Sequence, residues 1–323
     1  MFLSLLIFTL ALPSTASSSS IVPIINSVQN TWTAKLYENL PTPKLGVFKN
    51  YHLLDGDDHQ QQSSSTNNRA VMSIPDGTNS FDWRDTQYAQ CIGPIQQQGK
   101  CGSCWAVSTV ESVADRFCLF SQRNSTKTTT TTIFPPSVSR QDLSILDIIA
   151  CDKMCEGIEK CCRGCVGGYP KLAFAYIQKK GIVSETCMPW NISKSLLCPL
   201  PKCLPPLDDK TKKVKNIMQV YNMVDEIHRN GPVVATFTVY EDFMHYSSGI
   251  YNYSGVGKRL GLHAVKVVGY GINATTGMKY YKAQNSWGNS WGNNGSFQIY
   301  AETCGFQNSV YTATPCLKDD FCL

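Results

Sequence analysis

Residues Gln98–Trp105 read QGKCGSCW, and they constrain the structure and chemistry of this chain more than any other segment. From Ser103 onward, side chains recur at helical spacing through Phe117, so the sequence predicts a helix that begins near Cys104. Ser103 is a residue type that commonly caps a helix N-terminus. A thiol in this position gains acidity from the positive end of the helix dipole, so Cys104 is a candidate nucleophile.

Two further runs lie far downstream and supply the residue types that a thiol nucleophile needs. His263 lies in GLHAV, and Asn285 lies in QNSWG. Taken singly, a histidine or an asparagine is most often structural. Together with Gln98, Cys104 and the flanking glycine and tryptophan residues, however, the runs form a specific combination. The chain therefore resembles the papain family of cysteine peptidases.

Other features resemble the cathepsin B-like branch of that family. Cys91 and Cys118 bracket the nucleophile, as a disulfide does in that branch, and residues 227–251 are similar to it throughout. Residues 29–34, which read QNTWTA, resemble the start of its short pro-segment. The resemblance covers essentially all of residues 74–310.

The resemblance implies a role for each residue of the site. Cys104 is the thiolate nucleophile, and His263 is the imidazolium that pairs with it and later protonates the leaving amine. Asn285 orients the imidazole, as in the Cys-His-Asn form of the triad. Gln98 donates its side-chain amide to the oxyanion beside the backbone N–H of Cys104. Trp287 shields the hydrogen bond between Asn285 and His263 from water.

Three positions bear on substrate binding. Gly167 and Gly168 are expected to present backbone groups to the substrate residue P2, where a side chain would prevent close approach. In this branch an acidic residue forms the floor of the S2 pocket, and Ser309 occupies the corresponding position here. Because a P2 arginine would find no buried carboxylate there, the resemblance predicts apolar P2 residues in preference to arginine.

A further departure concerns the occluding loop of cathepsin B, whose paired histidines capture the C-terminal carboxylate of a substrate. The corresponding region here, about residues 187–203, is shorter and contains no histidine. The sequence therefore predicts an endopeptidase with little release of dipeptides from C-termini.

The order of elements predicts an α+β protein. Helical patterns cover Ser103–Phe117 and Tyr169–Lys179, and residues 124–132, rich in Thr, are predicted to form a surface loop after the first helix. Strand-like segments follow in the second half of the chain, at Val233–Val239, His263–Tyr270, Lys279–Gln284 and Ser296–Tyr300. The resemblance implies a papain-like two-domain fold. A helical left domain and an antiparallel β-barrel right domain would then flank the active-site cleft.

The N-terminal part predicts a secretory precursor. Residues 1–16 combine a short apolar stretch with small residues, as in a signal peptide, and no later stretch is long enough to span a membrane. Residues 17–73 are assigned to a propeptide, and the polar tract at 55–68 suits a cleavable linker. A disordered arm without a regulatory role stays an alternative for this region.

The mature peptidase would comprise residues 74–323, with a left part at about 85–200 and a right part at about 205–310. Such a precursor enters the secretory pathway. Its destination would be a lysosome-like or vacuole-like compartment, or the outside of the cell.

The chain contains 15 cysteines, which in a secretory protein indicates disulfides and at least one thiol left over. The pairs Cys101/Cys104 and Cys162/Cys165 have the spacing of zinc ligands, but they lie too far apart for a zinc ribbon. The resemblance implies a disulfide between Cys101 and Cys165 instead, and neither a metal nor another cofactor is expected. The pairing of the other cysteines stays open: Cys151, Cys155, Cys161, Cys162, Cys187, Cys198, Cys203, Cys304, Cys316 and Cys322.

The charge of the chain favours no nucleic-acid partner. The net charge is +5, and the basic run Lys210–Lys215 is more typical of a solvated face. The expected partners are protein and peptide substrates, the chain's own propeptide as inhibitor, and cystatin-type inhibitors of a monomeric enzyme. Sequons for N-glycosylation begin at Asn124, Asn191, Asn252, Asn273 and Asn294.

Two alternatives come from other classes of protein. A catalytically silent homologue would act as a secreted binding protein, but its mark would be the loss of Cys104, His263 or Gln98. A disulfide scaffold would match the motif by accident. Labelling of one thiol by an active-site alkylator, abolished by unfolding, would exclude both.

Overall fold

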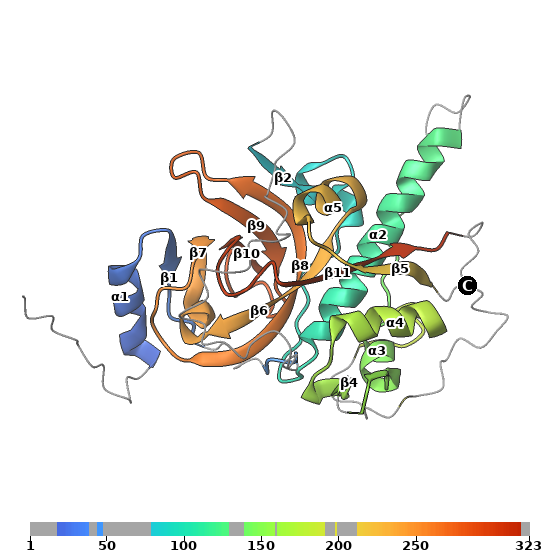
Figure 1. The fold of residues 1–323 in the computed structure, drawn as a ribbon, viewed down its shortest axis with the longest axis horizontal. Coiled ribbons are helices and arrows are strands. Elements are labelled where there is room, and N and C mark those ends of the chain that lie inside the picture. Colours follow the sequence, from blue (N-terminus) through green and yellow to red (C-terminus); the bar gives the residue numbers. More distant parts are fainter. Residues whose placement is uncertain are drawn as a thin grey trace, which may run out of the picture.

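The computed structural model describes residues 18–38, 44–47, 79–128, 139–158, 160–190, 198 and 212–317. Within these residues, the helices between residues 104 and 180 (α2, α3 and α4) lie on one side of a large, mostly antiparallel sheet, and α1 (Ser18–Val28) lies at its far edge beside β1 (Trp32–Ala34) (Figure 1). The predicted α+β class is therefore confirmed. The predicted signal peptide and the polar tract at 55–68 lie outside the described residues.

The helical part is built around α2 (Cys104–Thr128), which packs against α3 (Ile145–Cys151) and α4 (Pro170–Lys180). A buried cluster between these helices includes Trp105 and Phe174. The N-terminal part of α2 is buried on all sides, because strands of the sheet cover the face turned away from α3 and α4.

The helix α2 begins at Cys104, as predicted. The carbonyl of Ser103 accepts hydrogen bonds from the N–H groups of Ala106 and Val107, each at 2.9 Å. The hydroxyl of Ser103 is buried and has no hydrogen-bond partner among the described residues. Ser103 therefore starts the helix through its backbone, and the predicted side-chain cap is not formed.

The same helix ends at Thr128, so the prediction of a loop was wrong for residues 124–128. Asn, Ser and Thr disfavour a helix interior by only about 0.5 kcal/mol each relative to alanine. Adding them to an existing helix avoids the cost of nucleation, so the first turns of α2 carry the helix through this segment. Residues 129–132 of the predicted loop lie outside the described part of the chain.

Sequence signals at their ends explain α3 and α4. The side chain of Ser144 accepts from the N–H of Asp147 at 3.0 Å, which caps α3. Pro170 occupies the first turn of α4, where its missing N–H costs nothing. Gly181 ends this helix with a φ of 81°, a conformation that favours glycine.

The sheet has nine strands among the described residues, and β2 pairs with β8 beside its main path β1–β7–β10–β9–β8–β6–β11–β5. The bounds of these strands are β1 Trp32–Ala34, β2 Ser80–Asp82, β5 Val214–Gln219, β6 Val233–Tyr240, β7 Tyr246–Tyr251, β8 Arg259–Ile272, β9 Lys279–Gln284, β10 Ser296–Tyr300 and β11 Ser309–Pro315. The described path starts at β1 and stops at β5, so closure into a barrel stays a prediction.

Shorter elements complete the described part of the chain. They are the helices α1 (Ser18–Val28) and α5 (Met223–Asn230), the hairpin of β3 (Cys155–Glu156) and β4 (Lys160–Cys161), and 3-10 turns at Trp83–Asp85, Ala89–Cys91, Gly164–Val166 and Glu241–His245.

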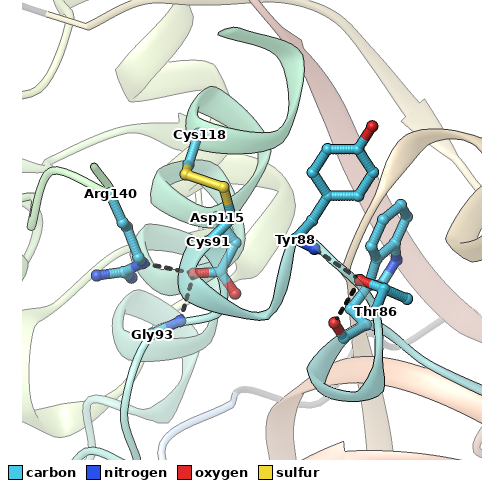
Figure 2. Close-up of a disulfide and its surroundings, with 8 residues drawn as sticks. Thr86, Tyr88, Cys91, Gly93, Asp115, Cys118 and Arg140 are labelled. Carbon is cyan, nitrogen blue, oxygen red and sulfur yellow. Dashed lines mark hydrogen bonds and ion pairs between the residues drawn. A yellow bond between two sulfur atoms is a disulfide. The ribbon is translucent and has the colours of Figure 1, made fainter. Parts of the chain in front are cut away.

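A buried ionic cluster joins the helical part to the sheet. Figure 2 shows Asp115 of α2 accepting from the backbone N–H of Gly93 (3.0 Å) and from Nε of Arg140 (2.6 Å), beside the Cys91–Cys118 disulfide. Nζ of Lys266 on β8 donates to the other oxygen of Asp115 at 2.6 Å. Because Asp115 and Lys266 belong to α2 and β8, their contact fixes these two elements against each other.

The N-terminal segment adds an edge to the sheet. Strand β1 pairs in antiparallel fashion with β7, and Trp32 packs against Tyr251 with ring centroids 5.1 Å apart. The indole N–H of Trp32 donates to the carbonyl of Asn252 at 2.9 Å. Gly249 has a φ of 89°, and a Cβ there would meet the carbonyl oxygen of Thr31 at 2.5 Å. Glycine is therefore required on β7 for this segment to dock.

Candidate active site

Cys104 and His263 lie where the helical part meets the sheet. Cys104 is the first residue of α2, and its thiol is buried and free. His263 is a buried residue of β8, paired with Phe237 of β6. The backbone N–H of Ala264, the next residue of β8, interacts with the sulfur of Cys104. The structure thus brings the predicted nucleophile next to the strand that carries the predicted base.

The imidazole of His263 is held by Asn285. Nε2 of His263 lies 2.8 Å from Oδ1 of Asn285, which also accepts from the backbone N–H of Ser286 at 2.8 Å. Since this oxygen only accepts, Nε2 carries the proton and Nδ1 is the unprotonated nitrogen of the neutral ring. Nδ1 is buried without a hydrogen-bond partner among the described residues. It is therefore available to take a proton.

Burial shifts both groups toward their neutral forms. Desolvation raises the pKa of the Cys104 thiol to about 11, although backbone N–H groups of Ala264 and Gly46 oppose this shift. Desolvation also lowers the pKa of His263 to about 4, opposed by the hydrogen bond to Asn285. In this state a thiol and a neutral imidazole are favoured over an ion pair.

Gln98 is fixed on both sides of its side-chain amide. Nε2 donates to the carbonyls of Cys101 (2.9 Å) and Lys44 (3.0 Å), and Oε1 accepts from the hydroxyl of Ser286 at 2.5 Å. Ser286 was not predicted as a site residue. It follows Asn285 directly, so the QNSWG run was the available signal, but its contact with Gln98 depends on the folded arrangement.

Trp287 lies against the base. Its ring centroid is 4.9 Å from that of His263, and the indole is buried. Its backbone pairs with Gln97, the neighbour of Gln98. The indole therefore lies against the imidazole of His263, and its role in shielding the hydrogen bond to Asn285 stays a prediction.

Residues 44–47 lie directly across these groups. The carbonyl of Lys44 accepts a hydrogen bond from the side-chain amide of Gln98, and the N–H of Gly46 interacts with the sulfur of Cys104. A Cβ at Gly46 would come within 2.0 Å of the carbonyl oxygen of Gly102, so only glycine fits this contact. The segment therefore contacts the predicted nucleophile and the predicted oxyanion donor at the same time.

The two predicted glycines have different surroundings. The N–H of Gly168 donates to the carbonyl of Gly46 at 2.8 Å, and a Cβ on Gly168 would lie 2.5 Å from the ring of Trp105. Gly167 has a φ of 147°, and its carbonyl accepts from the N–H of Arg163 at 2.8 Å. Of the two, Gly168 is the glycine whose backbone N–H binds the segment at residues 44–47.

A cavity of about 1090 Å³, including its open mouth, lies beside residues 44–47 and is lined by both the helical part and the sheet. Ser309 and Phe237 contribute from the sheet, and Tyr169 and Leu172 contribute from the helical side. Val47 borders the cavity and pairs with Gly168 and Leu262. The predicted pocket residue Ser309 therefore faces the space next to the segment.

The cysteine pairing settles the zinc alternative. The expected disulfides Cys91–Cys118 and Cys101–Cys165 are both present. The Cys101–Cys165 bond uses one thiol of each CxxC pair, so neither pair keeps both of its thiols. Cys151–Cys198 and Cys155–Cys161 are two further disulfides. Cys187 and Cys316 are also disulfide-bonded.

Comparisons with known proteins show the family of the chain. The model of the papain family cysteine proteases matches residues 77–314. The chain is 34% identical over 254 residues to cathepsin B of Dictyostelium discoideum, covering 71% of this chain and 72% of the relative. It is 31% identical over 340 residues to the cathepsin B-like cysteine proteinase 5 of Caenorhabditis elegans, covering 93% and 90%.

A solved structure shares the architecture across nearly the whole chain. Procathepsin B S9 from Trypanosoma congolense superposes with a TM-score of 0.65 at 25% identity, covering 94% of this chain and 99% of that one. The chain belongs to the papain family of cysteine proteases. Its relatives within that family are cathepsin B-like enzymes, so the expected resemblance is confirmed.

No helix within the described residues combines the length and the apolar character needed to cross a bilayer.

Proposed function

We propose that this chain is the zymogen of a cathepsin B-like cysteine endopeptidase in which Cys104 and His263 carry the reaction. The observation that supports this most is the free thiol at the start of α2, next to a strand whose histidine is held by Asn285 with Nδ1 left open. A binding protein would have no need for this combination. The acidity of a thiol and the tautomer of a ring matter to proton transfer, not to packing.

The residues define a sequence of steps. In the open enzyme, Nδ1 of His263 takes the proton of Cys104, and the thiolate attacks the carbonyl carbon of the peptide. The carbonyl oxygen becomes an oxyanion held by the amide of Gln98 and the N–H of Cys104. The C–N bond then breaks as the imidazolium protonates the leaving amine. A water molecule, deprotonated by the same imidazole, hydrolyses the thioester and regenerates the thiol.

Residues 17–73 would act as the inhibitory propeptide. The carbonyl of Lys44 lies on the Gln98 amide that the oxyanion needs, and Gly46 covers the sulfur. Removal of this segment would expose both groups to water and substrate, so desolvation would no longer favour their neutral forms. The enzyme would thus become reactive when the propeptide leaves.

The wider assignments follow the same proposal. Residues 1–16 would direct the chain into the secretory pathway, toward a lysosome-like compartment or out of the cell, and residues 74–323 would form the mature, glycosylated monomer. Oxidised cysteines in the described part of the chain suit this compartment. Cystatin-type proteins would be external inhibitors.

Thiol reactivity tests the proposal directly. In the zymogen, a pKa of about 11 leaves on the order of one Cys104 in 10⁴ as thiolate at pH 7, and this fraction rises with pH. After propeptide removal, iodoacetamide is expected to alkylate Cys104 at pH 6 at least about 100-fold faster than in the zymogen. Peptide mass mapping would give both rates. Cys162, a second buried thiol, should stay slow in both forms. Equal rates at Cys104 in the two forms would contradict the proposal.

The choice between internal and terminal cleavage gives a second prediction. Since residues 187–203 contain no histidine, nothing in that region supplies the imidazole pair that holds a C-terminal carboxylate in cathepsin B. A peptide with a free C-terminus and its amidated twin should be cleaved internally at rates within about threefold. Mass spectra over time would check this. Stepwise loss of dipeptides from the free C-terminus alone would count against an endopeptidase.

Ser309 also supports a proposal about specificity. It lines the cavity beside Val47, and it brings no charge to that wall. We expect apolar P2 side chains to bind there in preference to arginine, because the guanidinium would lose water without gaining a partner.

A further inference from the structure

A hairpin that sequence analysis did not identify forms part of the cavity that contains Ser309. Its two strands pair Cys155 with Cys161 and Glu156 with Lys160, and the disulfide between the two cysteines closes it. Both Glu156 and Lys160 line the cavity. A short hairpin stabilised by a disulfide holds its side chains in place better than an open loop does.

The carboxylate of Glu156 in this hairpin forms an ion pair with a lysine of α4. Nζ of Lys171, in the first turn of α4, lies 2.9 Å from Oε1 of Glu156. The hydrogen bond from Lys171 lowers the pKa of Glu156, so the carboxylate is ionised. About half of each side chain is exposed, at 46% for Lys171 and 52% for Glu156. An ion pair of this exposure contributes little to folding, so breaking it should leave the enzyme folded.

The charged side chains that line the cavity carry a net positive charge. Among the described residues that line it, the charged ones are Glu156, Lys160 and Lys171. The opposite wall, with Ser309 and Phe237, is neutral. A cationic substrate side chain would therefore meet two ammonium groups and one carboxylate that Lys171 already occupies.

We propose that the Glu156–Lys171 pair determines the charge preference of the S2 pocket. Lys171 neutralises an acidic group that would otherwise receive a P2 arginine, so the pair turns a pocket with a carboxylate into one that prefers apolar side chains. The occupant is the P2 side chain of a peptide, because Val47 of the chain itself borders this cavity while its backbone pairs with Gly168. This inference rests on the proposed function as a peptidase.

Substitution of Lys171 tests the inference. In processed Lys171→Met enzyme, Glu156 no longer has its ion-pair partner on α4. A P2 guanidinium can then form charge-assisted hydrogen bonds with its carboxylate. The ratio of kcat/KM for an Arg-Arg amide to that for a Phe-Arg amide is expected to rise about tenfold over wild type. Active-site titration normalises each preparation to the amount of competent enzyme.

Two further variants distinguish the effect of breaking the Glu156–Lys171 pair from the effect of removing one positive charge. In Lys171→Met with Glu156→Gln, the ratio should return to within about twofold of wild type, because the acceptor is gone. Lys179→Met removes the same charge from the exposed far end of α4 and should leave the ratio unchanged. A rise in this control, or one that persists in the double variant, would overturn the inference.

The two levels of the proposal fail in different ways. If wild-type enzyme cleaves neither substrate after propeptide removal, the proposed function is wrong. If Lys171→Met cleaves Phe-Arg at the wild-type rate without any gain on Arg-Arg, the peptidase stands and the role of the Glu156–Lys171 pair is refuted.

Discussion

Replacing Cys104 with alanine is expected to lower kcat/KM for peptide hydrolysis by on the order of 10⁴-fold or more. The substitution removes the only atom of the site that can form the thioester, while Gln98, His263 and Asn285 keep their contacts. Binding and oxyanion stabilisation alone leave only a small residual rate. The measurement is cleavage of a Phe-Arg amide by processed enzyme, with an inhibitor of contaminating peptidases present.

The chain offers a matched control for this experiment. Cys162 is also a buried, free thiol of the helical part, and it interacts with Asp152 rather than with a histidine. Cys162→Ala should retain activity within about threefold, because its sulfur interacts with Asp152 and the backbone N–H of Tyr169 and not with the groups proposed to react. Full activity in Cys104→Ala, or its loss in both variants, would show that the reactive sulfur has been assigned wrongly.

The candidate site residues could be proposed from sequence because chemistry restricts which residue types serve each step. A nucleophilic thiol, a base near neutral pH and an amide that orients it leave few choices, so short motifs around Cys104, His263 and Asn285 were informative. Ser286 and residues 44–47 were harder. Their role depends on contacts between segments far apart in the chain, such as Ser286 with Gln98 and Gly46 with Gly168.

The same distinction applies to the fold. The start of α2 follows from helical periodicity, whereas β6 and the central part of β8 are continuous buried runs rich in valine. The predicted end of α2 was wrong because cooperative extension of the helix outweighed the weak local preferences of residues 124–128. The hairpin at residues 155–161 has strands of only two residues each, too short for any period, so only its disulfide marks it.

The ionic cluster between α2 and β8 leads to the largest expected effect on stability. Asp115 is fully buried, and its carboxylate accepts from Arg140, Lys266 and the N–H of Gly93 (Figure 2). Without it, Lys266 would keep only Glu111, whose Oε2 lies 3.8 Å from Nζ and already accepts from Arg140. Arg140 would keep Glu111 and Asp142. Removing one partner from such a cluster costs about 3–5 kcal/mol of unfolding free energy, because a charge stays buried without compensation.

Asp115→Ala is therefore expected to lower the Tm by on the order of 10 °C, measured by calorimetry in the Cys104→Ala background so that autolysis does not interfere. Asp225→Ala is the control, since Asp225 pairs with Arg229 one turn along α5 and both side chains are mostly exposed. Such a surface pair contributes about 0.5 kcal/mol or less. Similar losses in the two variants would mean that solvent reaches the Asp115 cluster. The contact between α2 and β8 would then be held by apolar packing and not by charge.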